Sequence, residues 1–405
     1  MSKNLFIPGV SKRLASIDGI RGIAIILVMA FHFGLYGNGL ELATFIDRQV
    51  SRIILTGWIG VDLFFVLSGF LITGILYDTK HSRGYFRNFY MRRFLRIFPL
   101  YYGFLIVFFI LLPRIDPEGA GILSGFNQKV WYWTYLINWK IGFAGWPKYL
   151  AISHFWSLGV EEQFYLIWPA IVLCFRHRNL MQICSLFVVG SFLFRYFLAQ
   201  HGYDLVYVLL PARLDALAVG GFLALAFRSQ NGIVWLSRWT WPVLIASASA
   251  LLGLFIWKRG LEVEDFQVLT IGLSLIAIFF GAMVSLTVLS SQQIGLGKFF
   301  SSRILGLFGR YSYALYVFHH LASIYLPRFG ISISSFPKIM GSTLPGYIAF
   351  SIVATLVSLA LALISWYGLE SRFLALKRSF EYRTTGDKSD ENERLDTPAL
   401  AGLKE

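Results

Sequence analysis

Charged residues are scarce in this sequence, and their scarcity excludes an ordinary soluble globular protein. Asp, Glu, Lys and Arg make up only 14% of the 405 residues, whereas 56% are hydrophobic and 17% are aromatic. Soluble domains are typically less apolar and more charged. Because the apolar residues occur in long runs rather than scattered along the chain, the composition predicts a polytopic membrane protein.

Cysteine is nearly absent, since the chain contains only Cys174 and Cys184. The two flank one predicted turn and no metal-ligand spacing surrounds them, so the sequence supports neither a disulfide scaffold nor a cysteine metal site. The histidines and carboxylates elsewhere also lack a recognisable ligand spacing. We therefore expect no metal.

Acidic residues are the rarer charges: 22 Asp and Glu stand against 36 Lys and Arg, for a formal net charge of +14. In a membrane protein, a basic excess indicates cytoplasmic loops that face anionic lipid. The sequence has no basic patch interleaved with aromatic residues on a soluble domain, so we expect no nucleic-acid partner. It also has no evident internal repeat and no loop long enough for a separate globular domain.

About ten apolar runs are long enough to cross a bilayer as helices, because one span needs roughly 20 residues. They predict an all-α fold, a polytopic transmembrane helical bundle. Lys and Arg are more numerous in the loops on one side, and the positive-inside rule places that side, with both termini, in the cytoplasm. The predicted spans are roughly 15–36, 57–77, 96–113, 156–175, 182–200, 205–227, 240–257, 267–289, 305–326 and 347–369.

The chain divides into two parts of different composition. Residues 1–373 contain all the predicted spans and are expected to form one membrane domain. Residues 374–405 are polar and charged without apolar periodicity, which is typical of a disordered segment. We expect this second part to be a disordered cytoplasmic tail.

The first predicted span carries charge within an apolar helix. In SIDGIRGIAIILVMAFHFGLYG, Arg21 and His32 are eleven positions apart, which brings them to within about 20° of one helix face and separates them by roughly 16 Å along the axis. That rise is about half the hydrocarbon core of a bilayer. Ionisable groups at this depth usually face a bundle interior or a cavity. The alternative is a snorkelling arginine with a hydrogen-bonded core histidine.

Five spans bring ionisable groups to the middle or outer half of the bundle. Such groups at similar depth favour a polar cavity, whereas a structural ion-pair network at helix contacts is the alternative. The residues concerned are His32, Asp62, Glu161, Glu162, Arg213, Asp215, His319 and His320.

A second cluster of charge lies on the predicted cytoplasmic side, in RGYFRNFYMRRFLRIFPLYY. Arg93 and Arg96 are three residues apart and share a helix face. Two guanidinium groups suit a phosphate-bearing ligand, because each binds phosphate bidentately. The alternative is a pair of juxtamembrane arginines that contact lipid head groups.

These blocks resemble the acyltransferase 3 family of bacterial integral-membrane O-acyltransferases. The Arg-x10-His arrangement of Arg21 and His32 is similar to the family's motif in the first helix. The other blocks follow in family order, and the resemblance runs from about Leu14 to Phe373. They read GVDLFFVLSGFLIT, Arg93-x-x-Arg96, FWSLGVEEQFYLIWP, RLDALAVG and YSYALYVFHH.

The resemblance implies a fold, an activity and a location. It implies a multi-pass enzyme of the bacterial cytoplasmic (inner) membrane that takes an acyl group, with acetyl expected, from cytoplasmic acyl-coenzyme A. The implied acceptor is a hydroxyl of a surface carbohydrate or its lipid-linked precursor, and oligomers or polysaccharide-assembly proteins are the expected partners. The implied donor-binding residues are Arg21, Arg93 and Arg96, and the implied catalytic residues are His32, Glu161, Arg213 and Asp215.

Acyl transfer from a thioester to an alcohol needs a base and a site for the developing oxyanion. A neutral imidazole can accept a proton, so His32 is expected to be either a general base on the acceptor hydroxyl or a transient acyl carrier. A carboxylate such as Glu161, Asp62 or Asp215 would orient the ring. Arg213 would either stabilise negative charge or pair with Asp215.

Two other classes of function are compatible with the same sequence features. A polar cavity at the midplane would also suit a proton-coupled transporter or a flippase of a carbohydrate, although the sequence shows no inverted repeat and no matched pair of broken helices. A structural partner in a polysaccharide-export complex would explain the spans but not the histidine. Binding of coenzyme A distinguishes the enzyme from both alternatives.

Overall fold

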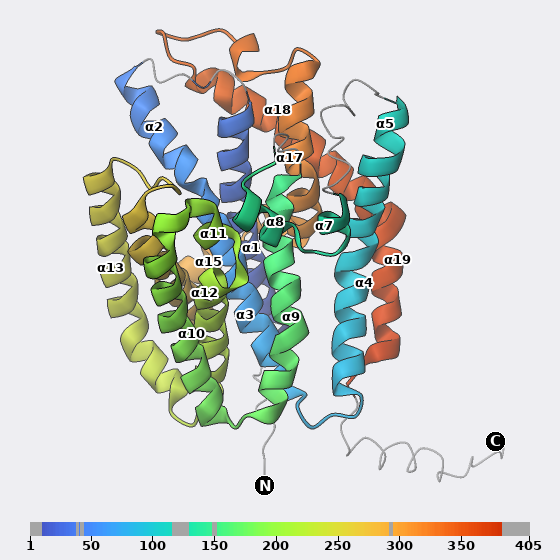
Figure 1. Ribbon diagram of the computed structural model, residues 1–405, viewed down its shortest axis with the longest axis vertical. Coiled ribbons are helices and arrows are strands. Elements are labelled where there is room, and N and C mark those ends of the chain that lie inside the picture. The colour runs from blue at the N-terminus through green and yellow to red at the C-terminus, as the bar shows by residue number, and fades with distance from the viewer. Residues whose placement is uncertain are drawn as a thin grey trace, which may run out of the picture.

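The computed structural model describes residues 10–37, 40, 44–115, 129–147, 152–290 and 295–382. The regular elements among these residues are helices, with a single isolated bridge between Ile339 and Ser342. The predicted all-α fold is therefore confirmed. In Figure 1 the long helices run side by side along one axis of the molecule.

The helices range from one turn to 27 residues in length. The α-helices are α1 (Val10–Tyr36), α2 (Phe45–Leu55), α3 (Gly60–Asp78), α4 (Tyr85–Ile106), α5 (Leu112–Ile115), α7 (Lys129–Trp133), α8 (Ile137–Ala144), α9 (Trp156–Cys174), α10 (His177–Leu198), α11 (Tyr203–Val208), α12 (Leu210–Ala226), α13 (Gly232–Lys258), α14 (Leu273–Leu289), α15 (Leu296–Phe300), α16 (Arg303–Arg310), α17 (Ser312–Arg328), α18 (Leu344–Ser365) and α19 (Ser371–Ala375). The short 3₁₀ or π segments are η1 (Thr56–Ile59), η2 (Val107–Leu111), η4 (Ser153–Phe155), η5 (Ala199–His201), η6 (Val268–Gly272), η7 (Ile333–Ser335), η8 (Trp366–Glu370) and η9 (Leu376–Phe380).

Within the described residues, eight helical segments are long and apolar enough to cross a membrane. They coincide with eight of the ten predicted spans. The other two predicted spans also form helices. Span 156–175 is α9, whose apolar run is interrupted by Glu161 and Glu162, and span 305–326 is divided between α16 and the 17-residue α17. The eight segments are Ala15–Tyr36, Phe45–Asp78, Tyr85–Ile115, His177–His201, Tyr203–Ala226, Gly232–Lys258, Val268–Leu289 and Leu344–Phe380.

Helix α3 occupies the centre of the bundle, where it packs against α1, α9, α12 and α14. Its crossing with α12 depends on glycine. A Cβ atom on Gly69 would lie 1.9 Å from the carbonyl oxygen of Leu217, and one on Gly220 would lie 2.0 Å from that of Val66. Because the two backbones approach this closely, no larger residue fits at either position.

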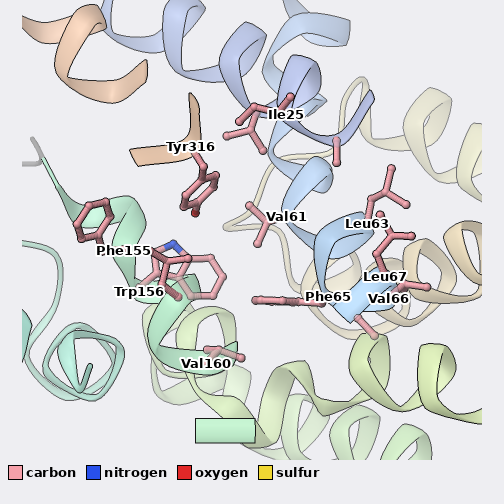
Figure 2. Packing of buried hydrophobic residues seen from close by; sticks show 14 of the residues in the cluster. Ile25, Val61, Leu63, Phe65, Val66, Leu67, Phe155, Trp156, Val160 and Tyr316 are labelled. Atoms are coloured by element: carbon pink, nitrogen blue, oxygen red, sulfur yellow. The ribbon is translucent and has the colours of Figure 1, made fainter. Parts of the chain in front are cut away.

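Aromatic and aliphatic side chains of α3, α9 and α17 form the core around the site. Figure 2 shows Val61 and Phe65 of α3 facing Trp156 of α9, with Tyr316 above them. The rings of Phe65 and Trp156 are 6.2 Å apart in an edge-to-face arrangement. This packing holds the middle of α3 at a fixed distance from α9 and α17.

The chain after α18 folds back along α4 instead of leaving the bundle. Residues 374–382, assigned from sequence to the tail, include the end of α19 and all of η9, which packs on α4. They lie at the same end of the molecule as the start of α4 (Figure 1). The rest of the predicted tail, 383–405, lies outside the described residues. That this end faces the cytoplasm stays a prediction.

Candidate active site

A cavity opens between α1, α3, α4, α9 and α17. It brings together four of the predicted catalytic and donor-binding residues, because Arg21, Arg93, Arg96 and Glu161 all line it. These residues come from three helices that are distant in sequence, so the cavity exists only in the folded bundle. Its other polar lining side chains are Ser68, Ser157, Glu162, Tyr165, Ser312, Tyr313 and Tyr316.

One end of the cavity is cationic. Arg21 approaches Asp18 at 3.9 Å, and both side chains keep about a third of their exposure, 31% and 39%. The Arg93 guanidinium lies over the Tyr165 ring, 5.5 Å from its centroid. The cavity arginines thus have loose contacts within the protein, which leaves their N–H groups available to a ligand.

Glu161 lies on the same cavity wall and is held by α3. Its Oε1 accepts a hydrogen bond of 2.6 Å from the Ser68 hydroxyl. Arg93 and Arg21 are within electrostatic range of the carboxylate. The Glu161 carboxylate is therefore placed to interact with the cavity arginines. Its contacts do not include the ring of His32.

His32 belongs to a cluster of four histidines. Its ring centroid is 4.9 Å from that of His319, 4.8 Å from that of His320 and 6.1 Å from that of His154. His319 and His320 come from α17, while His154 comes from η4, the turn before α9. Within the described part of the chain, none of the four lines the cavity.

The hydrogen bonds of the cluster define the tautomer of His32. His319 Nδ1 lies 2.8 Å from the carbonyl oxygen of Tyr316, which can only accept, so Nδ1 carries the proton and Nε2 is an acceptor. His32 Nδ1 lies 2.8 Å from the Val28 oxygen and 3.2 Å from His319 Nε2. Both neighbours accept, so His32 Nδ1 is the donor. The lone pair of His32 is consequently on Nε2.

The groups that orient the His32 ring are not carboxylates. The sequence suggested a carboxylate, namely Glu161, Asp62 or Asp215. In the structure the ring is held by the Val28 carbonyl oxygen and by His319. The suggestion of an orienting carboxylate is therefore corrected: a second histidine and a backbone oxygen take that place.

His154 contributes a second lone pair to the cluster. Its Nε2 donates to the Tyr316 carbonyl oxygen at 2.9 Å, so the lone pair is on Nδ1. Among the described residues this buried nitrogen has no hydrogen-bond partner. A buried acceptor without a donor is costly, and a bound hydroxyl group would satisfy it.

Two hydroxyl groups separate the cavity from the histidines. Ser157 and Tyr316 line the cavity, and their oxygens are 2.6 Å apart. Both hydroxyl groups also reach the His154 carbonyl oxygen as donors, Tyr316 at 2.8 Å and Ser157 at 3.3 Å. We call this pair the hydroxyl layer. Figure 2 shows Tyr316 directing its hydroxyl toward α9.

Arg213 and Asp215 do not pair with each other. Arg213 Nη2 lies 2.7 Å from Asp62 Oδ1 on α3, with both side chains 1% exposed. Asp215 Oδ2 lies 2.7 Å from Arg195 Nη2 on α10. Both partnerships match the alternative of a structural ion-pair network, and the suggested Arg213–Asp215 pair is corrected.

Arg213 pairs with Asp62 through only part of its guanidinium. Three aromatic rings surround its guanidinium, those of Phe65, Trp156 and Tyr207, at 5.6, 5.8 and 5.2 Å. Its Nε and Nη1 have no hydrogen-bond partner among the described residues. Cation–π contact compensates part of the missing hydrogen bonding.

Sequence reasoning missed two residues of this region, His154 and Arg195. His154 stands directly before FWSLGVEEQFYLIWP, outside the predicted span, and the depth argument considered only residues inside spans. Arg195 was read as part of an apolar helix. A search for charge in the last turn of α10 would have found it, because a buried arginine needs a carboxylate.

Across the residues that the structure describes, no group of three or more His, Cys, Asp or Glu side chains is arranged to hold a metal ion. Backbone oxygens already occupy one ring nitrogen each of His32, His154 and His319. The opposite ring nitrogens of His32 and His154 carry the lone pairs.

Comparison with known proteins places the chain in a family. It is 29% identical over 331 residues to the peptidoglycan O-acetyltransferase OatA of Listeria monocytogenes, covering 76% of this chain and 49% of that protein. It is 25% identical over 330 residues to the O-acetyltransferase OatA of Staphylococcus aureus, covering 76% and 50%.

The chain thus spans about half the length of these curated relatives. No solved structure matches it. The family model described as an acyltransferase domain matches residues 14–363, a region that contains the cavity, the hydroxyl layer and the histidine cluster. The chain therefore belongs to the acyltransferase 3 family.

Proposed function

We propose that the chain is a membrane O-acyltransferase of the bacterial inner membrane. It moves an acetyl group from acetyl-coenzyme A to a hydroxyl of a surface carbohydrate or its lipid-linked precursor. The family and the named O-acetyltransferase relatives support this activity. The observation that carries the proposal is the opposition of a cationic cavity end to a histidine cluster across the hydroxyl layer.

The cationic end binds the donor in this proposal. Arg21, Arg93 and Arg96 converge on one cavity, and their guanidinium groups suit the phosphate groups of coenzyme A. The thioester then points along the cavity toward the hydroxyl layer. Glu161 positions the arginines, and the buried pairs of Arg213 and Asp215 support the surrounding helices.

His32 carries out the proton transfer. Its Nε2 removes the proton of the acceptor hydroxyl while the oxygen attacks the thioester carbonyl carbon. The C–S bond then breaks, and the imidazolium returns the proton to the departing thiolate. In the acyl-carrier variant, Nε2 attacks the thioester first and the acceptor hydroxyl displaces it afterwards. Both variants use the lone pair that the contact with His319 leaves on Nε2.

A transporter or flippase is the competing function, and no contact among the described residues favours it over the enzyme. The decisive difference is turnover of acetyl-coenzyme A.

The test is turnover by purified protein in nanodiscs, with wild type compared with His32→Ala. We expect the substitution to lower acetyl transfer by about 10²–10⁴-fold, the usual contribution of a general base. His201→Ala is the matched control, because His201 is an exposed histidine of η5 outside the site, and it should retain wild-type turnover. Folding of each variant is followed by thermal unfolding. A His32→Ala protein that kept most of its activity would contradict the assignment.

A further inference from the structure

The last described segment of the chain is bound to the first turns of α4. We call residues 376–382, which comprise η9 and the two residues after it, the C-terminal strap. Asn88 Nδ2 donates to the Glu381 carbonyl oxygen at 3.0 Å. Arg92 Nη1 donates to the carbonyl oxygens of Lys377 and Phe380, both at 3.4 Å. Side-chain-to-backbone contacts from α4 therefore fix the path of the strap.

Stacking reinforces these hydrogen bonds. The Arg87 guanidinium lies 5.4 Å from the centroid of the Phe380 ring, and that of Arg92 lies 5.9 Å from the Tyr382 ring. Arginine over an aromatic face is favourable even at a partly exposed site. The strap is thus attached at several points to the helix that also carries Arg93 and Arg96.

The attachment brings a lysine onto α4 beside Arg92, one turn from Arg96. Lys377 is half-buried, and the charges that act on it include those of Arg96, Arg93, Arg92 and Arg21. All four are cations. Like charges at this separation repel one another, and the strap holds Lys377 in place by its own backbone oxygen. An anionic ligand would convert this repulsion into attraction.

We propose that Lys377 is a further donor-binding residue, which the C-terminal strap delivers to the arginine end of the cavity to bind a phosphate group of coenzyme A. This inference rests on the proposed function, since it assumes that the cavity arginines hold the donor. Lysine acts here as a point charge beside the bidentate arginines. The residue lies outside the region that the family model matches, which ends at 363.

A membrane offers a second source of the same chemistry, because lipid head groups also carry phosphate. The experiment therefore has two arms. The first measures binding of coenzyme A to the full chain in phospholipid-free detergent by isothermal titration calorimetry. The second measures the same affinity in nanodiscs of phosphatidylcholine alone and of phosphatidylcholine with phosphatidylglycerol.

In the first arm, Lys377→Gln should weaken coenzyme A binding about tenfold, as expected for loss of one charge-assisted hydrogen bond. Lys377→Arg should bind within about twofold of wild type. Arg378→Gln is the matched control, because it removes an adjacent, exposed positive charge of η9, and it should bind like wild type. In turnover assays, Lys377→Gln should raise the KM for acetyl-coenzyme A and leave kcat unchanged.

The variant Asn88→Ala distinguishes the attachment of the strap from the charge of Lys377. It removes an uncharged anchor of the strap and should weaken coenzyme A binding in the same direction while leaving every cation in place. Thermal unfolding of each variant shows whether it is folded.

Equal affinity of wild type and Lys377→Gln for coenzyme A would overturn the inference and leave the proposed function intact. Absence of any coenzyme A binding by folded wild type would remove the donor from the proposed function, and this inference with it. If Lys377→Gln changed only the effect of phosphatidylglycerol, the lysine would be a lipid contact and the inference would be wrong.

Discussion

Arginine serves in two different environments of this molecule. Arg213 and Arg195 each have a carboxylate oxygen at 2.7 Å, and the four side chains of these pairs are at most 3% exposed. Arg21, by contrast, is 31% exposed and has its nearest paired carboxylate at 3.9 Å. Burial with an internal partner therefore commits a charge to the structure, whereas a loosely paired charge beside a cavity is available to a ligand.

The largest effect on stability is expected for the buried ion pairs. Asp62→Ala leaves the Arg213 guanidinium buried without its carboxylate, which typically costs about 3–5 kcal/mol. We expect a clearly lowered midpoint of thermal unfolding in detergent. Arg96→Gln, a change at the cavity, is the matched control and should alter stability by less than about 1 kcal/mol. Equal stability of both variants would remove the distinction between the two environments.

The cavity side predicts the opposite behaviour. Arg93→Gln with Arg96→Gln should weaken coenzyme A binding by about 1.5–3 kcal/mol for each charge-assisted bond lost, with little change in unfolding. Lysine at both positions keeps the charge but loses the bidentate geometry and should fall between wild type and the glutamine pair. Unchanged affinity in the double glutamine variant, measured by calorimetry, would refute the phosphate role.

The smallest effect is expected on kcat, from the loss of the hydrogen bond between His319 and His32. His319→Phe removes the acceptor for His32 Nδ1 and frees that ring to change tautomer. Loss of one hydrogen bond of about 1 kcal/mol predicts a kcat lower by roughly fivefold. His319→Gln, whose amide oxygen can accept, should recover part of the rate. The ring ¹⁵N shifts of His32 report the tautomer directly, and an unaltered Nδ1–H form in His319→Phe would show that Val28 alone sets it.

The spans could be predicted from sequence because they depend on local composition. A run of about 20 apolar residues is helical in a membrane whatever it packs against. The common orientation of Arg21 and His32 could also be predicted, because it follows from helix geometry alone. The ends of the helices depend on packing and could not be predicted in the same way. The span predicted as one continuous helix over 305–326 is divided in the structure between α16 and the 17-residue α17.

The partners within the site could not be read from sequence. Arg213 and Asp215 are neighbours in RLDALAVG, yet residues two apart on a helix point to nearly opposite sides and do not face each other. Their true partners lie on α3 and α10, and the choice depends on how these helices pack on α12. Likewise, His154 meets Tyr316 across a sequence separation of 162 residues.

The hydroxyl layer has a consequence for the membrane itself. A bundle with a polar cavity on one side and a histidine cluster on the other contains the elements of a proton wire, and a continuous wire would dissipate the gradient on which the cell depends. Ser157 and Tyr316 line the cavity, and the Tyr316 hydroxyl directs its proton to a backbone oxygen. We therefore expect this pair to interrupt proton relay between the cavity and the histidine cluster until a substrate enters.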